Sequence, residues 1–144
     1  MIVIGIVGSR RRNSNQDKSA LISKIKELMQ TYGGPENVRF CSGHCKLGAD
    51  KFAEEIALEV YGQEFFNKMI IHKPDENKLD KNLLKINSRA TYREINYDRN
   101  TLIAIDSDVL VALVASDRKG GTEDTIRKFK KVNSKSWDNK LFLL

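Results

Sequence analysis

Two adjacent glycines and a threonine, Gly120-Gly121-Thr122, stand between a continuous apolar run and a segment with helical spacing. Glycines allow a backbone to approach a ligand closely, and the unpaired amides at the start of a helix point toward bound anions. The threonine could also cap the helix as its N-cap residue. This arrangement is typical of a cradle that binds a phosphate group.

A second turn of the same kind lies near the N-terminus, where the apolar run 2–7 leads into Gly8-Ser9-Arg10. A serine hydroxyl, backbone amides and a guanidinium fork can together bind a phosphate. Arg11 and Arg12 continue the basic run. Because these residues follow a predicted core strand, we expect all three arginines to face a ligand.

A third polar turn follows the predicted strand 38–41 and contains Ser42, Gly43, Gly48 and Asp50. Asp50 could accept hydrogen bonds from the hydroxyl groups of a ribose. An acidic residue at a helix start also compensates the helix dipole, so both roles stay open for Asp50.

Two further polar residues, Arg99 and Asn100, lie in the middle of a predicted helix. Arg99 could reach the turns and bind a phosphate or a carboxylate. The alternative for Arg99 is a salt bridge to Asp106 or Asp108. We expect Asp108, at the start of a strand, to order its loop rather than to act in catalysis.

Cys41 and Cys45 flank a histidine, His44, in a spacing that could suggest zinc. The other histidine is His72, which leaves too few ligands for a four-coordinate structural site. We therefore expect no metal and no cofactor. Cys41 is expected to be a small buried residue at a strand end, and neither histidine is expected to be catalytic.

The elements that must position these residues follow from the alternation of apolar runs and helical periodicity. We expect strands at residues 2–7, 38–41, 69–72, 109–114 and 141–144. We expect helices at 17–32, with Asp17 as the N-cap, from residue 49 or 50 to 61, from residue 89 or 92 to 105, and at 122–132. Residues 75–88 are expected to form a polar loop with at most a short helical turn.

Continuous apolar strands that alternate with amphipathic helices indicate an α/β fold with a parallel sheet covered on both faces. We predict one domain, residues 1–144, with a Rossmann-like, doubly wound sheet of five strands in the order 3-2-1-4-5. In such a sheet, ligands bind at the carboxyl ends of the strands where the winding reverses, between the first and fourth strands. The three polar turns converge at that point.

Composition and charge narrow the range of partners. The chain has a net charge of +6, which favours anionic partners from mononucleotides to nucleic acid. Aromatic residues make up only 8% of the chain, so the stacking platforms typical of single-stranded nucleic-acid binding are scarce. No apolar run approaches the roughly 20 residues of a membrane span, and no basic segment precedes the first one, so we expect a cytoplasmic protein without membrane contact.

The ordered set of turns resembles a known group of proteins, the SLOG superfamily. This superfamily unites the Rossmann-like domain of DNA-processing protein A with the LOG ("lonely guy") phosphoribohydrolases, and the chain is most similar to its small stand-alone members of unassigned function. The resemblance extends over nearly the whole chain. The matching segments are Gly8-Ser9-Arg10, Ser42-Gly43, Lys46-Leu47-Gly48-Ala49-Asp50, Arg99-Asn100, Asp106-Ser107-Asp108 and Gly120-Gly121-Thr122.

The resemblance implies a pocket for a nucleotide or a nucleotide-derived ligand. LOG-type enzymes cleave the N-glycosidic bond of a nucleoside monophosphate and carry the signature Pro-Gly-Gly-x-Gly-Thr-x-x-Glu, in which the Glu is catalytic. This chain has Thr125 at the position of that Glu. Its neighbours Glu123 and Asp124 point to other sides of the helix.

We therefore expect a protein that binds a nucleotide or nucleotide-derived phosphorylated ligand at the carboxyl ends of strands one, two and four, as a sensor or carrier. The alternative is a nucleoside monophosphate phosphoribohydrolase or a deoxyribosyltransferase-like enzyme, with Glu123 or Asp50 stabilising an oxocarbenium-like sugar and Arg99 holding the phosphate. Single-stranded nucleic-acid binding is a third hypothesis, and a homo-oligomer is left open. The predicted ligand-binding residues are Gly8, Ser9, Arg10, Ser42, Gly43, Gly48, Asp50, Arg99, Asn100, Gly120, Gly121 and Thr122.

Overall fold

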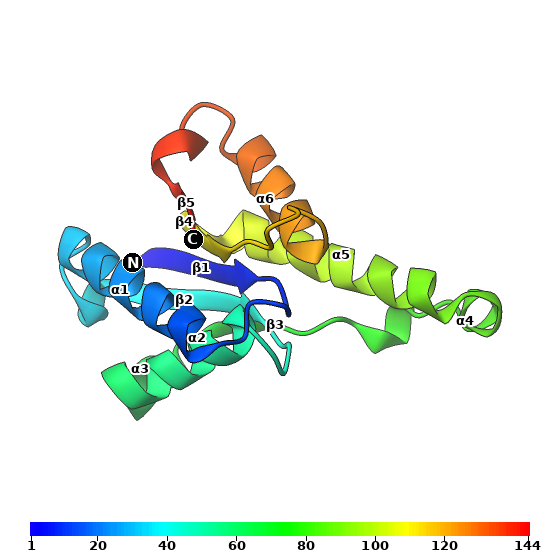
Figure 1. Cartoon of the computed structure of the whole chain (residues 1–144), viewed down its shortest axis with the longest axis horizontal. Coiled ribbons are helices and arrows are strands. Elements are labelled where there is room, and N and C mark those ends of the chain that lie inside the picture. The colour runs from blue at the N-terminus through cyan, green and yellow to red at the C-terminus, as the bar shows by residue number, and fades with distance from the viewer.

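Five strands form one parallel sheet in the order β3-β2-β1-β4-β5, as the sequence predicts (Figure 1). The computed structural model describes residues 1–144. The strands are β1 (Ile2–Gly8), β2 (Val38–Gly43), β3 (Ile70–His72), β4 (Val109–Leu113) and β5 (Leu141–Leu143).

Six α-helices connect and cover these strands. They are α1 (Asn15–Thr31), α2 (Ala49–Ile56), α3 (Gln63–Asn67), α4 (Lys81–Ile86), α5 (Ser88–Asp106) and α6 (Gly121–Val132). Shorter turns are the 3-10 turns η1 (Pro35–Asn37), η3 (Glu76–Lys78) and η4 (Trp137–Asn139) and the π-helical turn η2 (Ala57–Tyr61), which continues α2. None of the helices combines the length and apolar character that a membrane crossing requires.

Helices pack on both faces of the sheet, so the core has two apolar layers. On one face, α1 and α2 lie over strand residues that include Ile4 and Phe40. On the other face, Ile103 of α5 and Phe129 of α6 pack with Leu110 of β4. All five residues of β4 are buried, as expected for a central parallel strand covered on both sides.

Two predicted helix caps are wrong. Ser14 caps α1: its hydroxyl accepts a hydrogen bond from the Asp17 amide at 3.1 Å, and the Asp17 carboxylate accepts one from the Ser14 amide at 3.1 Å. Together they form a capping box, in which Asp17 is the third helical residue rather than the cap. In α6 the N-cap is Gly120, not Thr122, and no side chain caps that helix. At each helix start, two residues with similar capping propensity lie within one turn: Ser14 and Asp17 at α1, and Gly120 and Thr122 at α6. The backbone geometry determines which of the two is the N-cap.

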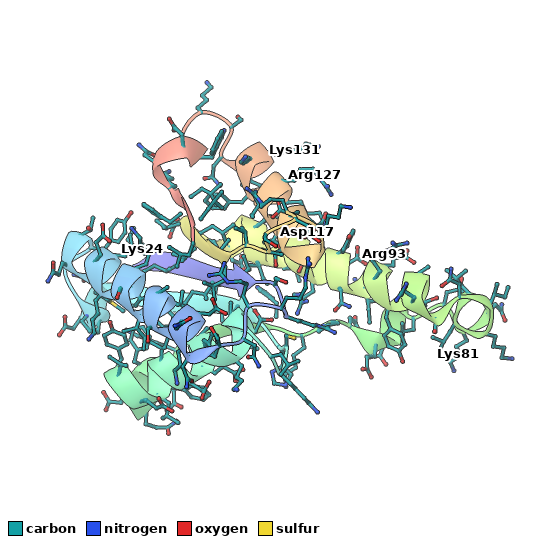
Figure 2. All side chains as sticks on the ribbon, viewed as in Figure 1. Lys24, Lys81, Arg93, Asp117, Arg127 and Lys131 are labelled. Atoms are coloured by element: carbon teal, nitrogen blue, oxygen red, sulfur yellow. The ribbon has the colours of Figure 1, made fainter.

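The predicted polar loop at 75–88 contains more helix than a single turn, since both η3 and α4 lie in it. No residue of α4 is buried. Figure 1 shows the first half of α5 extending past the sheet, with α4 at its outer end. In Figure 2, Lys81 lies at the tip of this arm and Arg93 lies farther in along α5. The arm therefore brings the first turns of α5 to the edge of the sheet where strands end.

Candidate anion-binding site

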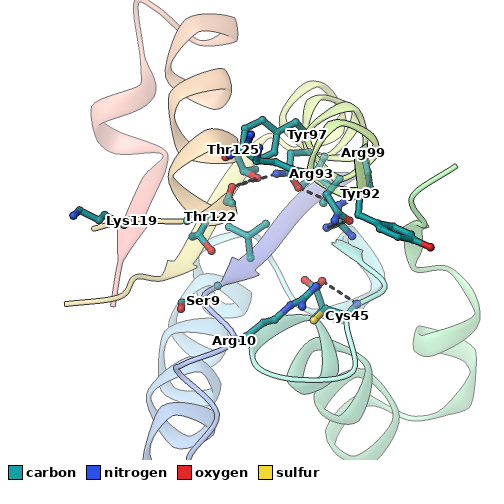
Figure 3. Close-up of a pocket in the computed structure, with 18 of the residues that line it drawn as sticks. Ser9, Arg10, Cys45, Tyr92, Arg93, Tyr97, Arg99, Lys119, Thr122 and Thr125 are labelled. Carbon is teal, nitrogen blue, oxygen red and sulfur yellow. Dashed lines mark hydrogen bonds between the residues drawn. The ribbon is translucent and has the colours of Figure 1, made fainter. Parts of the chain in front are cut away.

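A pocket of about 680 Å³ lies at the carboxyl end of β1, between the turn after that strand, α5 and the start of α6 (Figure 3). This is where a doubly wound sheet changes its winding direction. The predicted residues that line the pocket are Gly8, Ser9, Arg10, Asp50, Arg99, Asn100, Gly120, Gly121 and Thr122. The structure thus brings together residues as far apart in the chain as Gly8 and Thr122.

The lining is strongly basic. Six basic side chains face one acidic side chain, Asp50; the basic residues are Arg10, Arg11, Arg89, Arg93, Arg99 and Lys119. Arg11 has a carboxylate partner, Asp117, at 2.7 Å. The other five form no salt bridge in the structure. Cations gathered without counterions repel one another, so an anionic ligand in the pocket would relieve that repulsion.

Arg99 is half-buried, whereas the other five basic residues of the pocket are exposed. Its Nε donates to the Asn100 carboxamide at 3.0 Å and its Nη2 donates to the Asn96 carboxamide at 3.5 Å, while Nη1 forms no hydrogen bond within the protein. Burial lowers the pKa of Arg99, and the nearby Asp50 carboxylate offsets part of that effect. The predicted alternative is excluded, since Arg99 forms no salt bridge to Asp106 or Asp108. Asp106 instead contacts His72.

Asp108 orders its loop, as the sequence predicts. Its carboxylate accepts a hydrogen bond from the Val3 amide at 2.8 Å. In return, the Asp108 amide donates to the Val3 carbonyl at 2.8 Å. These contacts hold the start of β4 beside the start of β1, away from the pocket.

Asp50 lies in the pocket near the start of α2 and is half-buried. Its Oδ2 accepts a hydrogen bond from the Cys45 amide at 3.1 Å. Burial raises the pKa of Asp50 above its ordinary value, although the charge of Arg99 and hydrogen bonds from the Cys45 and Gly43 backbones act in the opposite direction. Asp50 is therefore a carboxyl group that a ligand in the pocket can reach and that its surroundings bias toward the neutral form.

Ser42, Gly43 and Gly48 do not line the pocket, and Gly43 supports it from behind. A Cβ atom on Gly43 would lie 2.3 Å from Arg99 Nη1 and 2.7 Å from Asp50 Oδ2. The Arg99 guanidinium and the Asp50 carboxylate can therefore lie this close to the β2 backbone only because residue 43 has no side chain. Ser42 is fully buried. Gly48 has φ +74°, and its amide donates to Asn13 at 2.8 Å.

The start of α6 offers backbone donors to the pocket. Gly120, Gly121 and Thr122 all line it, and the amides of the first helical residues, Gly121 and Thr122, have no partner within the helix. Asn100 fixes this turn, because its Nδ2 donates to the Gly121 carbonyl at 3.2 Å. The positive end of the helix dipole therefore adds to the basic side chains.

The predicted catalytic candidate Glu123 lies apart from these groups. Its carboxylate accepts two hydrogen bonds from Arg118, at 2.7 and 2.8 Å, and it does not line the pocket. The next acid, Asp124, is buried and pairs with Arg127 and Lys128. Thr125, by contrast, does line the pocket.

The three consecutive arginines have three different roles, so the prediction that all face a ligand is wrong for Arg12. Arg10 lines the pocket without a protein partner, and Arg11 lines it while paired to Asp117. Arg12 Nη1 donates to the carbonyls of Val114 at 2.7 Å and Leu144 at 2.8 Å. Its Nε donates to Asp17 at 2.7 Å, so Arg12 fastens the turn to α1 and β4.

Sequence reasoning missed most of the α5 wall of the pocket. Figure 3 shows Tyr92, Arg93 and Tyr97 on this helix, above Arg10 and Cys45 from the opposite side. The additional lining residues on α5 are Arg89, Tyr92, Arg93, Asn96, Tyr97 and Ile103. Their spacing of three to four residues, shared with Asn100, marks one face of a helix and could have revealed them.

The comparisons with known proteins add no relative: no family model, no curated protein and no solved structure matches the chain.

Proposed function

We propose that this pocket binds a nucleotide or a nucleotide-derived phosphorylated ligand, which the protein senses or carries. The observation that carries the proposal is the charge of the lining, in which five basic side chains without carboxylate partners face one acid. Such a lining is costly for the folded protein alone and favourable once an anion is bound. The five residues are Arg10, Arg89, Arg93, Arg99 and Lys119.

A phosphate group fits best between the start of α6 and the turn after β1. Backbone amides of Gly121 and Thr122 point out of the helix there, and Ser9 and Arg10 face them across the pocket. Backbone donors at a helix start combined with a guanidinium fork are a strong arrangement for a phosphate.

The remainder of the pocket suits a nucleoside. Its volume of about 680 Å³ lies within the range of small-molecule sites. Tyr92 and Tyr97 offer flat rings on which a base can stack, and Asp50 offers a carboxylate to sugar hydroxyls. An inorganic anion alone would leave these groups unused.

The test is a calorimetric titration of the purified protein with a nucleoside, its mono-, di- and triphosphates, and inorganic pyrophosphate. We expect binding of the phosphorylated nucleosides and at least roughly 10-fold weaker binding of the bare nucleoside and of pyrophosphate. Arg99→Gln should weaken nucleotide binding by roughly 10-fold or more. Lys135→Gln removes the same charge from an exposed position outside the pocket and should leave binding unchanged.

A second candidate, cleavage of an N-glycosidic bond, is favoured by the placement of Asp50. A carboxyl group with a raised pKa can protonate a leaving base, and its ionised form can stabilise an oxocarbenium-like sugar. Incubation with nucleoside monophosphates would then release base and ribose 5-phosphate. Asp50→Asn should abolish that release while binding persists, and Glu123→Gln should leave it intact, because Glu123 lies outside the pocket.

A further inference from the structure

Three side chains with metal-binding atoms meet where α5 ends against the outer strands of the sheet. They are Cys41 on β2, His72 at the end of β3 and Asp106 at the end of α5. One donor atom from each lies within 4.8 Å of the others. None of the three lines the anion-binding pocket, so the cluster is a separate feature of the molecule.

The sheet register places two of these residues on the same face. Cys41 pairs with Ile70, and Gly43, two residues farther along β2, pairs with His72. Side chains two residues apart on a strand share a face, so Cys41 and His72 both lie under α5. The helix then ends at Asp106, whose carboxylate contacts His72 Nε2 at 2.6 Å. The carbonyl end of a helix carries partial negative charge, which also favours a cation at this point.

The donor set is one that zinc prefers. Sulfur, imidazole nitrogen and carboxylate oxygen bind Zn²⁺ at about 2.0 to 2.3 Å. Structural zinc sites use four protein ligands, whereas sites that leave the fourth position to water or a substrate use three, as here. Cys41 is completely buried, whereas the side chains of His72 and Asp106 are 19% and 39% exposed. The cysteine would thus be the inner ligand, and the solvent side would admit the ion and a water molecule. Zinc would take the place of the hydrogen bond between His72 and Asp106.

A cysteine, histidine and aspartate in contact could also suggest a nucleophilic triad. A nucleophile must meet its substrate, however, and no surface of Cys41 is accessible. A buried thiol beside an imidazole and a carboxylate is better suited to hold a metal ion.

We propose that Cys41, His72 and Asp106 bind a Zn²⁺ ion whose fourth position is open to solvent, where the end of α5 meets the β2–β3 edge of the sheet. Binding forms a Zn–S bond, and the thiol proton of Cys41 passes to the solvent. Because the ion binds the folded chain, it raises the melting temperature.

The test uses the full chain after treatment with a chelator, with Co²⁺ as a spectroscopic probe. We expect one Co²⁺ per chain, an absorption band of the cobalt–thiolate bond, and loss of that band when Zn²⁺ displaces the cobalt. Cys45→Ser removes the other cysteine, which lies in the anion-binding pocket, and should leave the band unchanged. Cys41→Ser should abolish it.

Cys41 is a core residue, so its replacement could prevent folding. His72→Ala and Asp106→Asn change partly exposed side chains and provide the independent test. Each should weaken Co²⁺ binding by roughly 10-fold or more and remove the rise in melting temperature. Absence of the cobalt–thiolate band in the unaltered chain would overturn the proposal, and so would a band that is lost in Cys45→Ser or is unchanged in His72→Ala and Asp106→Asn.

Discussion

At the scale of single residues, the pocket depends on two charged side chains and on the space left by a glycine. Arg99 and Asp50 line the pocket with their charges only partly compensated, and Gly43, behind them, has no side chain in the space beside both groups. The five basic side chains that have no carboxylate partner are the feature that distinguishes this cavity from an ordinary surface cleft.

Gly43→Ala should damage the pocket directly. The new methyl group would lie 2.3 Å from Arg99 Nη1, so the guanidinium must move. We expect nucleotide affinity to fall by roughly 10-fold or more, as measured by calorimetry. Ser134→Ala, at an exposed position outside the pocket, is the control and should leave the affinity unchanged. Equal affinities for Gly43→Ala and the unaltered protein would argue against this role of Arg99 and Asp50.

Asp50 should also make the free energy of unfolding depend on pH. Its pKa is raised in the folded protein above the ordinary value of 3.8, so the folded state holds the proton more tightly than the unfolded state. This group therefore lowers the free energy of unfolding as pH rises from about 3.8 through its raised pKa. Across that window the stability of Asp50→Asn should improve relative to the unaltered protein. Denaturant unfolding at several pH values measures the difference, and a change of opposite sign would contradict the pKa direction.

At the scale of elements, the turn after β1 connects the pocket to the fold. Arg12 holds this turn to α1 and β4, whereas its neighbour Arg10 points to the pocket without a partner. The capping box of Ser14 and Asp17 fixes the start of α1 at the same place. One short segment thus combines an arginine bonded to the fold with an arginine that lines the pocket.

The pair Arg10→Gln and Arg12→Gln separates these roles. Arg12→Gln removes charge-assisted hydrogen bonds to Asp17 and to two backbone carbonyls, and we expect it to destabilise the fold by about 2 kcal/mol. Arg10→Gln should leave the free energy of unfolding unchanged within about 0.5 kcal/mol and weaken nucleotide binding. Denaturant melts and calorimetry on both variants give the answer. Stability lost in Arg10→Gln and retained in Arg12→Gln would reverse the assignment.

Much of the arrangement of elements could be predicted from the sequence, because apolar periodicity and glycine turns mark strands and helices locally. The strand order is confirmed, and so is a start of α2 near Ala49 or Asp50, which the structure places at Ala49. Helix α3 was missed because Gly62 was interpreted only as the end of a helix, while it also begins the next one. Helix α4 was underestimated because its residues bury nothing and carry no packing pattern.

The candidate site likewise has a part that the sequence predicts and a part that depends on tertiary packing. A glycine turn that follows a predicted strand must lie at the carboxyl end of that strand, so Ser9, Arg10 and Gly120 could be placed in the pocket from the sequence. The separation of Glu123 from the pocket, and the contact between His72 and Asp106, depend on tertiary packing. The spacing of residues along the chain therefore could not predict either feature.

At the scale of the whole molecule, both the net charge of the chain and the local charge of the pocket are positive. The chain carries +6 overall, and the arm formed by α4 and the first half of α5 adds arginines to one wall of the pocket. A positively charged concave site attracts anions over a distance set by ionic strength. This distribution of charge supports the proposal of a small ligand with several negative charges.

Salt should weaken the binding of nucleotides in proportion to their charge. We expect the affinity for a nucleoside triphosphate to fall more steeply between low and high salt than the affinity for the monophosphate, because more ion pairs are screened. Titrations at several salt concentrations measure both slopes. Parallel slopes would show that the additional phosphates do not meet the basic side chains.

The most direct measurement of the central claim is ligand-observed NMR of the purified protein with a panel of nucleoside mono-, di- and triphosphates and the parent nucleosides. We predict saturation transfer to phosphorylated members of the panel and its loss with Arg99→Gln. No transfer to any nucleotide, or equal transfer with Arg99→Gln, would contradict a nucleotide site in this pocket.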